Sequence, residues 1–400
     1  MSRLTALHCF GSYLPITENW AYRLVSNQRD TERLVASPSF LDNDFYPAGM
    51  TYLRSPLQPR MSTSDGSLRA FLQRRQARLN AYVYPRYLRW LLRRRRIDVV
   101  HSHFAHVGWK FRDLARQLRA AHVVSFYGLD YVQMQSLEPA WKERLPRLFA
   151  QADLFVCEGP HGAGLLAGQG CPESKIQVGK LGVDPDSIPF HARHKDAGQL
   201  RLLQLASFRE KKGHLDTIGA FASAIRDCPN IHLTLAGASP GPILDQVTAE
   251  IDRQNLAAHV TLMPGIALDA LHGFMRDYDV FIHPSRHAAD GDCEGGAPIV
   301  LLDAQATGMP VIATRHCDIP QEVVDGVTGI LTEEGDVEGL ADAIRVFHEM
   351  PPETYLGYAA AARRHVERHF DVRDCATHME SLYRVACGTN QSMAGDKHAP

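Results

Sequence analysis

The sequence lacks the long apolar runs that a membrane-spanning helix requires, because no stretch reaches 18 consecutive apolar residues. The amino-terminal segment MSRLTALHCFGSYLP has no continuous apolar core of the kind found in secretory signal peptides. The eight cysteines form no C-x-x-C pair and no His/Cys group with zinc-ligand spacing, which is typical of a protein in a reducing compartment. We therefore expect a cytoplasmic protein without a metal site.

An overall excess of charge is also absent. Lys and Arg number 43 against 45 Asp and Glu, and the formal net charge is −2, so the whole molecule carries no signature of nucleic-acid binding. The chain has 400 residues, which is too long for one compact core. Two domains of roughly 150–200 residues are expected.

One local excess of charge lies between Arg69 and Arg96, where there are ten arginines and no Asp or Glu. Aromatic residues are interleaved with them: Tyr82, Tyr84, Tyr87 and Trp90. Two interpretations stay open: a solvated helix with cations near its carboxyl end, or a surface helix that meets anionic lipid headgroups. Nucleic-acid binding is less favoured because no recognition motif accompanies the segment.

Short apolar runs alternate with helical segments in both halves of the chain. Strands are expected in the first half at 4–10, 97–104, 121–128, 152–159 and 175–183. Strands are expected in the second half at 200–208, 231–237, 259–265, 279–285, 310–314 and 328–336. Such runs, punctuated by glycine and separated by helices, indicate buried parallel strands with βαβ crossovers. The predicted fold class is α/β, with two doubly wound Rossmann-like domains that face each other across a ligand-binding cleft.

The polar, proline-containing segment 185–199 reads as the linker between the two domains. The predicted domains are 1–190 and 198–370. A helical stretch covers 355–387, and its last part, 371–387, could pack back on the first domain. Residues 388–400 have the composition of a disordered tail.

A glycine loop with an acid on either side stands out in the second half, in the stretch DGDCEGGAPIVLLDAQATGMPVIAT (290–314). Pro298 suits the first position of a helix and Gly308 suits its end. Gly295, Gly296 and Ala297 then precede a helix amino terminus, where free backbone N–H groups favour an anion such as a diphosphate.

Glu294 and Asp303 flank this predicted anion site. Carboxylates accept pairs of hydrogen bonds from vicinal hydroxyls, so two acids around a diphosphate fit a nucleotide diphospho-sugar, which has a sugar at each end. The alternative is that Glu294 caps the loop and Asp303 is an ordinary helix acid.

The stretch is similar to the signature of the family 4 retaining glycosyltransferases, a large group with the two-domain GT-B fold. That signature is a Glu, seven residues and a second Glu, followed by Ala-x-x-x-Gly-x-Pro-Val-Ile. Here eight residues separate Glu294 from Asp303, and the second acid is Asp. The spacing from Pro298 to Asp303 is kept, so the extra residue falls in the glycine loop. The resemblance implies that Glu294 contacts the transferred sugar and that Asp303 holds the ribose.

A second resemblance lies in ASFREKKGHLDTIGAF (206–221), similar to a family stretch in which an Arg and a Lys bind the diphosphate. Lys212 matches that Lys, Ser207 stands where the Arg is expected, and Arg209 is a candidate substitute. YDVFIHPS (278–285), which contains His283, and DIPQEVVDGVTGIL (318–331) match further family segments.

The first half resembles the acceptor-side domain of the family. VVHSHFAHVG (99–108) and VVSFYGLDY (123–131) resemble the strand ends that form the other wall of the cleft, and they offer His103 and Tyr127 as catalytic candidates. The family usually has His where Tyr127 stands, although Tyr can still donate a hydrogen bond. SYLPITENWAYRLV (12–25) resembles an acceptor-side segment, which makes Thr17 and Glu18 candidates for acceptor binding.

The resemblance implies retaining transfer from a nucleotide diphospho-sugar to a glycan or polyprenyl-linked acceptor in surface polysaccharide biosynthesis. No cofactor or metal is expected, because Lys212, Arg209 and the loop amides can stabilise the departing diphosphate. Peripheral contact with the cytosolic face of a membrane is expected through Arg69–Arg96. Two alternatives stay open: a nucleotide-sugar 2-epimerase of the same architecture, and a catalytically degenerate partner of a transferase, which the departures at Ser207, Tyr127 and Asp303 would allow.

Overall fold

The structure is a computed structural model of the 400-residue chain. It describes residues 3–13, 15, 18–41, 49–58, 68–131, 133–193, 195, 198–238 and 241–395. Two compact units divide the chain: unit 1 comprises Met1–Lys180 with Val372–Pro400, and unit 2 comprises Leu181–Asp371. Residues 181–190, assigned to the first domain from the sequence, therefore belong to unit 2.

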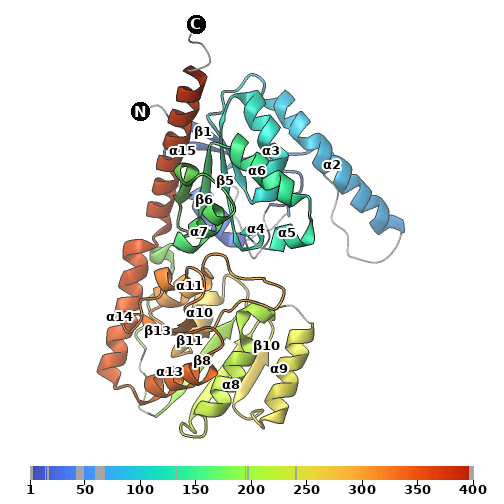
Figure 1. Ribbon diagram of the computed structural model, residues 1–400. Coiled ribbons are helices and arrows are strands. Elements are labelled where there is room, and N and C mark those ends of the chain that lie inside the picture. The colour runs from blue at the N-terminus through green and yellow to red at the C-terminus, as the bar shows by residue number, and fades with distance from the viewer. Residues whose placement is uncertain are drawn as a thin grey trace. The chain divides into compact units, whose positions relative to one another are not determined.

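Unit 1 is built on a seven-stranded parallel sheet with the order β3-β2-β1-β4-β5-β6-β7 (Figure 1). Its strands are β1 (Leu4–Cys9), β2 (Thr31–Ser37), β3 (Thr51–Arg54), β4 (Val99–His103), β5 (Ala121–Ser125), β6 (Leu154–Cys157) and β7 (Ile176–Val178). Its helices are α1 (Asn19–Ser26), α2 (Leu68–Leu92), α3 (Ala105–Leu118), α4 (Gly128–Tyr131), α5 (Gln133–Leu137), α6 (Trp141–Gln151), α7 (Pro160–Gly168) and α15 (Val372–Gly395), with the 3₁₀ turn η2 (Glu173–Lys175). The strand order changes direction between β1 and β4, the place where doubly wound sheets bind ligands.

Helix α2 carries most of the arginine-rich segment and packs against α3. Its buried side chains recur at every fourth position, Asn80, Tyr84, Leu88 and Leu92, and the last three of these lie in the core. Residues four apart lie on one face of a helix, so a narrow stripe holds α2 on the unit and leaves the rest of its surface outside.

Helix α15 returns the end of the chain to unit 1, where it packs along β5 and α1 (Figure 1). Leu382, Tyr383 and Ala386 are buried in this contact. The helix continues to Gly395, so residues 388–395 are helical and not the start of a disordered tail as the composition suggests. Residues 396–400 lie outside the described residues.

Unit 2 is built on a six-stranded parallel sheet with the order β10-β9-β8-β11-β12-β13. Its strands are β8 (Leu200–Leu205), β9 (Ile231–Ala236), β10 (Val260–Met263), β11 (Val280–His283), β12 (Val311–Thr314) and β13 (Gly329–Thr332). Its helices are α8 (His214–Ala224), α9 (Pro242–Arg253), α10 (Leu271–Met275), α11 (Val300–Ala306), α12 (Ile319–Glu322), α13 (Val337–Glu349) and α14 (Pro352–His369), with the 3₁₀ turns η3 (Pro185–Ser187) and η4 (Glu210–Lys212).

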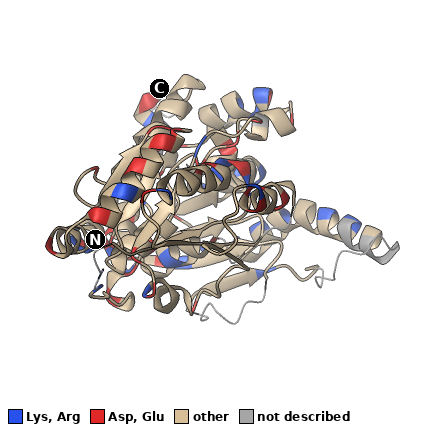
Figure 2. Cartoon of the chain, turned by 90° about the horizontal axis from the view of Figure 1, so that it is seen from below, with Lys and Arg blue, Asp and Glu red and all other residues tan. Residues whose placement is uncertain are grey.

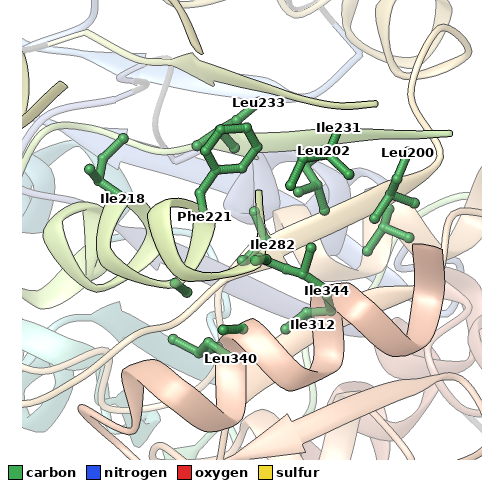
Figure 3. Packing of buried hydrophobic residues seen from close by; sticks show 14 of the residues in the cluster. Leu200, Leu202, Ile218, Phe221, Ile231, Leu233, Ile282, Ile312, Leu340 and Ile344 are labelled. Atoms are coloured by element: carbon green, nitrogen blue, oxygen red, sulfur yellow. The ribbon is translucent and has the colours of Figure 1, made fainter. Parts of the chain in front are cut away.

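The largest apolar cluster of unit 2 lies between its sheet and helices α8 and α13 (Figure 3). Leu202 and Leu233 on the strands meet Ile218 and Phe221 of α8 and Ile344 of α13. The strands read as continuous apolar runs because both of their faces are covered.

The two parallel α/β sheets confirm the predicted fold class, and every predicted strand region contains a strand. Strands β2 and β3 were not predicted. In β2, TERLVAS, polar residues in the first half hide the apolar run that follows. The predicted linker, 185–199, is part of unit 2 and does not connect the two units. Its Arg193 is buried and donates to the carbonyl oxygens of Thr307 and Tyr278 in that unit. Across the described residues, no helix combines the length and the apolar content needed to cross a bilayer.

Candidate active site

Lys212 and Glu294 form an ion pair at the carboxyl ends of strands β8 and β11. Lys212 ends η4, and its Nζ lies 2.8 Å from the Glu294 carboxylate. The next residue, Gly213, has φ +66°, and a Cβ there would overlap the carbonyl oxygen of Pro284. A glycine is therefore required for the chain to turn from Lys212 into α8.

Glu294 is held on several sides. Its Oε1 accepts from Ser285 Oγ at 2.8 Å, and its backbone N–H donates to Nε2 of His316 at 3.1 Å. Nε2 of His283 lies 3.9 Å from Oε1. Burial alone would raise the pKa of Glu294, but Lys212, Lys211 and His283 hold that pKa well below its usual range. The side chain is thus a carboxylate, which can accept hydrogen bonds from hydroxyl groups.

Two further cations lie beside this pair. Lys211 Nζ donates to Oδ1 of Asp292 at 3.0 Å and to the carbonyl oxygen of Cys293 at 2.8 Å. Arg209, largely exposed, lies 4.0 Å from Oδ2 of Asp292. Ser207, the other predicted donor-binding residue, is half-buried in the same turn, and its carbonyl oxygen accepts from the Arg209 N–H at 2.8 Å.

The glycine loop differs from the prediction at its helical end. Helix α11 begins at Val300, so Pro298 precedes the helix and is not its first residue. Gly308 ends the helix as predicted: it has φ +81°, and the N–H of the following Met309 donates to Ala304 O at 3.0 Å. This is the geometry of a glycine-terminated helix.

The backbone groups of the loop have partners within the protein. Gly295 has φ +77°, and its N–H is directed at the thiols of Cys293 and Cys317. The carbonyl oxygen of Gly296 accepts from the N–H of Asp318 at 3.1 Å. Gly295 therefore contributes to the thiol cluster of the loop, and a role in binding a diphosphate rests more directly on Gly296 and Ala297.

Asp303, the second acid of the motif, pairs with a histidine. It sits in the first turn of α11, is 1% exposed, and its Oδ1 lies 3.0 Å from Nε2 of His272. His272 is the more exposed member of this pair. A ligand that approaches Asp303 meets His272 as well, a contact that the motif spacing does not reveal.

In unit 1, His103 and Tyr127 belong to a closed ring of buried side chains. Its members come from β1, β4, β5, α15 and the segments after α1 and β5: His8, Gln28, His101, His103, Ser125, Tyr127 and Tyr383. The structure thus brings together the two predicted catalytic residues with five side chains that the sequence did not point to.

The orientation of the Gln28 amide determines which atoms donate and which accept hydrogen bonds along one side of the ring. Its Oε1 accepts from His8 Nε2 (3.1 Å), so His8 Nδ1 accepts from His103 Nε2 (3.2 Å). His103 Nδ1 must then accept from the Tyr127 hydroxyl, 3.0 Å away. With this orientation of the Gln28 amide, the Tyr127 hydroxyl donates its hydrogen bond to His103.

The other side of the ring runs through the carboxyl-terminal helix. Gln28 Nε2 donates to the Tyr383 hydroxyl (3.0 Å), which donates to His101 Nδ1 (2.7 Å), and His101 Nε2 donates to Ser125 Oγ (2.7 Å). A side-chain hydrogen bond joins Ser125 to Tyr127 and closes the ring. Burial lowers the pKa of His8 to about 4 and those of His101 and His103 well below their usual values, so all three imidazoles are neutral.

The predicted acceptor-side pair is described only in part. Thr17 lies outside the described residues. Glu18 precedes α1, and burial raises its pKa to about 7. Trp20, two residues further, has its ring centroid 4.3 Å from that of Tyr127. A carboxyl that titrates near neutrality, close to an aromatic contact with Tyr127, suits proton exchange or hydroxyl binding.

The chain thus has two parallel α/β sheets, and one of them presents a Lys–Glu pair and further cations at its strand ends, where sheets of this kind bind ligands. Residues 189–365 match the model of the glycosyl transferases group 1, and residues 55–187 match that of glycosyltransferase family 4. The chain therefore belongs to the group 1, family 4 glycosyltransferases, whose two domains have the GT-B fold.

Individual relatives agree with this assignment. The chain is similar to the amylovoran biosynthesis glycosyltransferase AmsK of Erwinia amylovora, at 31% identity over 68% of this chain and 67% of the relative. It is also similar to the putative colanic acid biosynthesis glycosyltransferase WcaL of Escherichia coli, at 30% identity over 72% and 71%. The structure of Anabaena HepE in complex with UDP-glucose superposes with a TM-score of 0.68 at 16% identity, covering 96% of this chain and 100% of that chain, and so shares the fold. The named transferases favour glycosyl transfer over the epimerase and scaffold alternatives.

Proposed function

We propose that the protein transfers a sugar, with retention of anomeric configuration, from a nucleotide diphospho-sugar to a glycan or lipid-linked acceptor in the biosynthesis of a surface polysaccharide. The single observation that carries this proposal is the half-buried Lys212–Glu294 pair beside Lys211 and Arg209. The names of AmsK and WcaL support the polysaccharide acceptor, and the HepE complex supports a UDP-sugar as one donor to test.

In the proposed mechanism, negative charge grows on the departing diphosphate as the glycosidic bond breaks. Lys212 has three N–H donors, so it can hold Glu294 and a phosphate oxygen at the same time. Lys211 and Arg209 add positive potential, and fixed charges of this kind stabilise the transition state without reorganisation. Glu294 accepts hydrogen bonds from the transferred sugar, and the leaving phosphate takes the proton of the acceptor hydroxyl.

The proposed chemistry needs no divalent metal at the diphosphate. Transfer by chelator-treated protein should therefore not rise when Mg²⁺ or Mn²⁺ is added. A clear rise in rate with either ion would show that the protein cations are insufficient.

The donor is identified by a thermal-shift panel of UDP, GDP, ADP and CMP and their sugars. A ligand at about 100 times its dissociation constant adds roughly 2.7 kcal/mol of stability. Absence of a shift with every nucleotide, in protein that is folded, would contradict the proposed donor class.

Two variants then separate the proposed roles of the acids. Glu294→Gln should impair transfer and leave the binding of the bare nucleotide nearly intact. Asp303→Asn should weaken binding of the bare nucleotide, because we propose that Asp303, together with its partner His272, holds the ribose. Asp245→Asn, at an exposed position of α9, is the matched control. The opposite pattern for the two acids would reverse the assignment.

We also propose that α2 brings the enzyme to an anionic membrane surface. Beyond its buried stripe, the helix exposes large apolar side chains: Phe71, Leu72, Leu79, Tyr82 and Trp90. Arg75, Arg78, Arg86 and Arg89 are exposed on the same helix. Figure 2 shows basic and no acidic positions along it. Aromatic and basic residues together are typical of helices that lie in a lipid interface.

Not all the arginines serve this surface, because Arg95 pairs with Glu32 at 2.5 Å and Arg96 with Asp98 at 2.7 Å. Co-sedimentation with anionic vesicles should therefore fall when Arg75, Arg78, Arg86 and Arg89 are replaced by Gln. It should change little in the control, Arg95→Gln with Arg96→Gln. Equal binding to neutral and anionic vesicles, or no binding to either, would reject the membrane contact.

A further inference from the structure

A cluster of soft metal-ligating side chains lies next to the loop that carries Glu294. His287, Cys293 and Cys317 each offer one ligand atom, and these atoms lie within 4.8 Å of one another. They come from two segments: His287 and Cys293 lie in the loop between β11 and α11, and Cys317 follows β12. None of them has a part in the proposed transfer.

We propose that these three side chains bind one zinc ion, or a divalent cation of similar softness, and thereby fix the Glu294 loop to the segment after β12. Two thiolates and one imidazole are ligands that select zinc over hard cations such as Mg²⁺. Each thiol releases its proton to solvent when it binds the ion. Three protein ligands leave a fourth tetrahedral position for water.

The imidazole of His287 is held by a carboxylate at one nitrogen. Its Nδ1 lies 3.0 Å from the Glu334 carboxylate, to which it donates. Nε2 is then the nitrogen with the lone pair. Ligating histidines commonly donate their other N–H to a carboxylate in this way, which fixes ring orientation and raises ligand basicity.

The same carboxylate organises a second histidine beside the cluster. Nδ1 of His316 lies 2.7 Å from Glu334, and its Nε2 lies 3.1 Å from Cys317 Sγ and accepts the Glu294 N–H. His316 thus links the cluster to Glu294 through hydrogen bonds.

The backbone is shaped to present the two sulfurs. Cys317 has φ +48°, a left-handed conformation that a non-glycine residue adopts rarely and keeps only where its surroundings impose it. The N–H of Gly295 is directed at both thiols. Both features place the two sulfurs next to each other, where one ion can reach them.

A second group of possible metal ligands, in unit 1, is occupied by hydrogen bonds instead. His8, His101 and His103 also lie within ligand distance of one another, but all six of their nitrogens take part in the hydrogen-bonded ring of unit 1. A metal there would have to break that ring, whereas at His287, Cys293 and Cys317 it would replace protons.

The test is titration of chelator-treated, reduced protein with Co²⁺, followed by thiolate-to-cobalt charge-transfer absorption. We expect one Co²⁺ per chain, displaced by Zn²⁺. His287→Gln, at a half-exposed position where the fold tolerates change, should weaken binding, and Cys293→Ser with Cys317→Ser should abolish the charge-transfer band. Glu334→Gln should weaken binding about 10- to 100-fold, as the loss of a carboxylate behind a ligating histidine does. Cys228→Ser, a buried thiol elsewhere in unit 2, is the matched control.

Wild-type protein that takes up no Co²⁺ would overturn the proposal, as would binding that survives the double cysteine substitution. A Cys293–Cys317 disulfide that forms readily, with no metal uptake after its reduction, would also overturn it and leave a redox pair instead. Because the readout is metal binding, failure of this inference is distinct from failure of the proposed transfer reaction.

Discussion

The Nζ atom of Lys212 lies 2.8 Å from the carboxylate of Glu294, although 81 residues stand between them in the chain. The resemblance assigns the first to the diphosphate and the second to the transferred sugar, and the structure places the two side chains in contact. The pair also explains how a carboxylate stays ionised in a buried position, because the ammonium group offsets the cost of burial.

Replacing Lys212 by Met should lower kcat/KM by about 100-fold or more, because a charge that meets the departing phosphate is lost. Steady-state transfer assays with the donor identified by thermal shift measure this effect. Lys211→Met is the informative control, since Lys211 is engaged with Asp292 and the Cys293 carbonyl and should affect the rate less. Equal rate losses in both variants would mean that the two lysines act as one patch.

Replacing Tyr383 by Phe should open the hydrogen-bonded ring of unit 1 and reduce transfer. The loss leaves buried groups of Gln28 and His101 without this partner, at a cost of about 1–3 kcal/mol in unfolding free energy. Tyr84→Phe is a matched control in the same unit, because the Tyr84 hydroxyl donates to the Leu53 carbonyl outside the ring. Both variants should lose stability, but only Tyr383→Phe should lower kcat. A similar kcat for the two would limit the ring to a structural role.

The neutral, buried histidines of unit 1 should contribute less stability as the pH falls below about 6.5. Burial lowers the pKa of His8 to about 4 and of His122 to about 3, so the unfolded state binds protons there that the folded state does not. Stability from each group is full above the unfolded pKa and is lost as pH falls towards the folded one. Near pH 5 each such histidine contributes a slope of about 1.4 kcal/mol per pH unit.

Urea unfolding followed by tryptophan fluorescence measures this slope, because all four tryptophans, Trp20, Trp90, Trp109 and Trp141, lie in unit 1. His122→Gln, which lies outside the ring and bonds Ser102, should reduce the slope by one histidine's share. An unchanged slope in that variant would contradict the neutral, buried state of His122.

Replacing Gly213 by Ala should destabilise unit 2 far more than replacing Gly335. Both glycines have positive φ, +66° and +72°, so each Ala pays a backbone cost of about 1–2 kcal/mol. A Cβ at Gly213 would also overlap the Pro284 carbonyl oxygen, whereas nothing lies within 4 Å of one at Gly335. Calorimetric unfolding of the two variants compares them, and equal melting temperatures would contradict the tight turn after Lys212.

The sequence predicted most of the fold because buried parallel strands have a recognisable pattern, a short apolar run between two helices. It missed β2, whose polar first half interrupts that pattern. It also predicted a helix at 371–387, but the composition of the last residues concealed its continuation to Gly395. Composition reports average polarity, and a helix can continue through a polar segment once its earlier turns are packed against a sheet.

The sequence by itself determined the α/β class, the family resemblance and the glycine at position 308 that follows the end of α11. These features depend on residues close together in the chain, whose spacing sets helix and strand periodicity and turn geometry. Only the tertiary structure decided that Asp303 lies against His272, that Tyr127 gives its proton to His103, and that Cys293 and Cys317 meet His287. Parallel sheets bring the ends of distant strands to one edge, so the partners of each side chain are fixed by strand order, which no local pattern encodes.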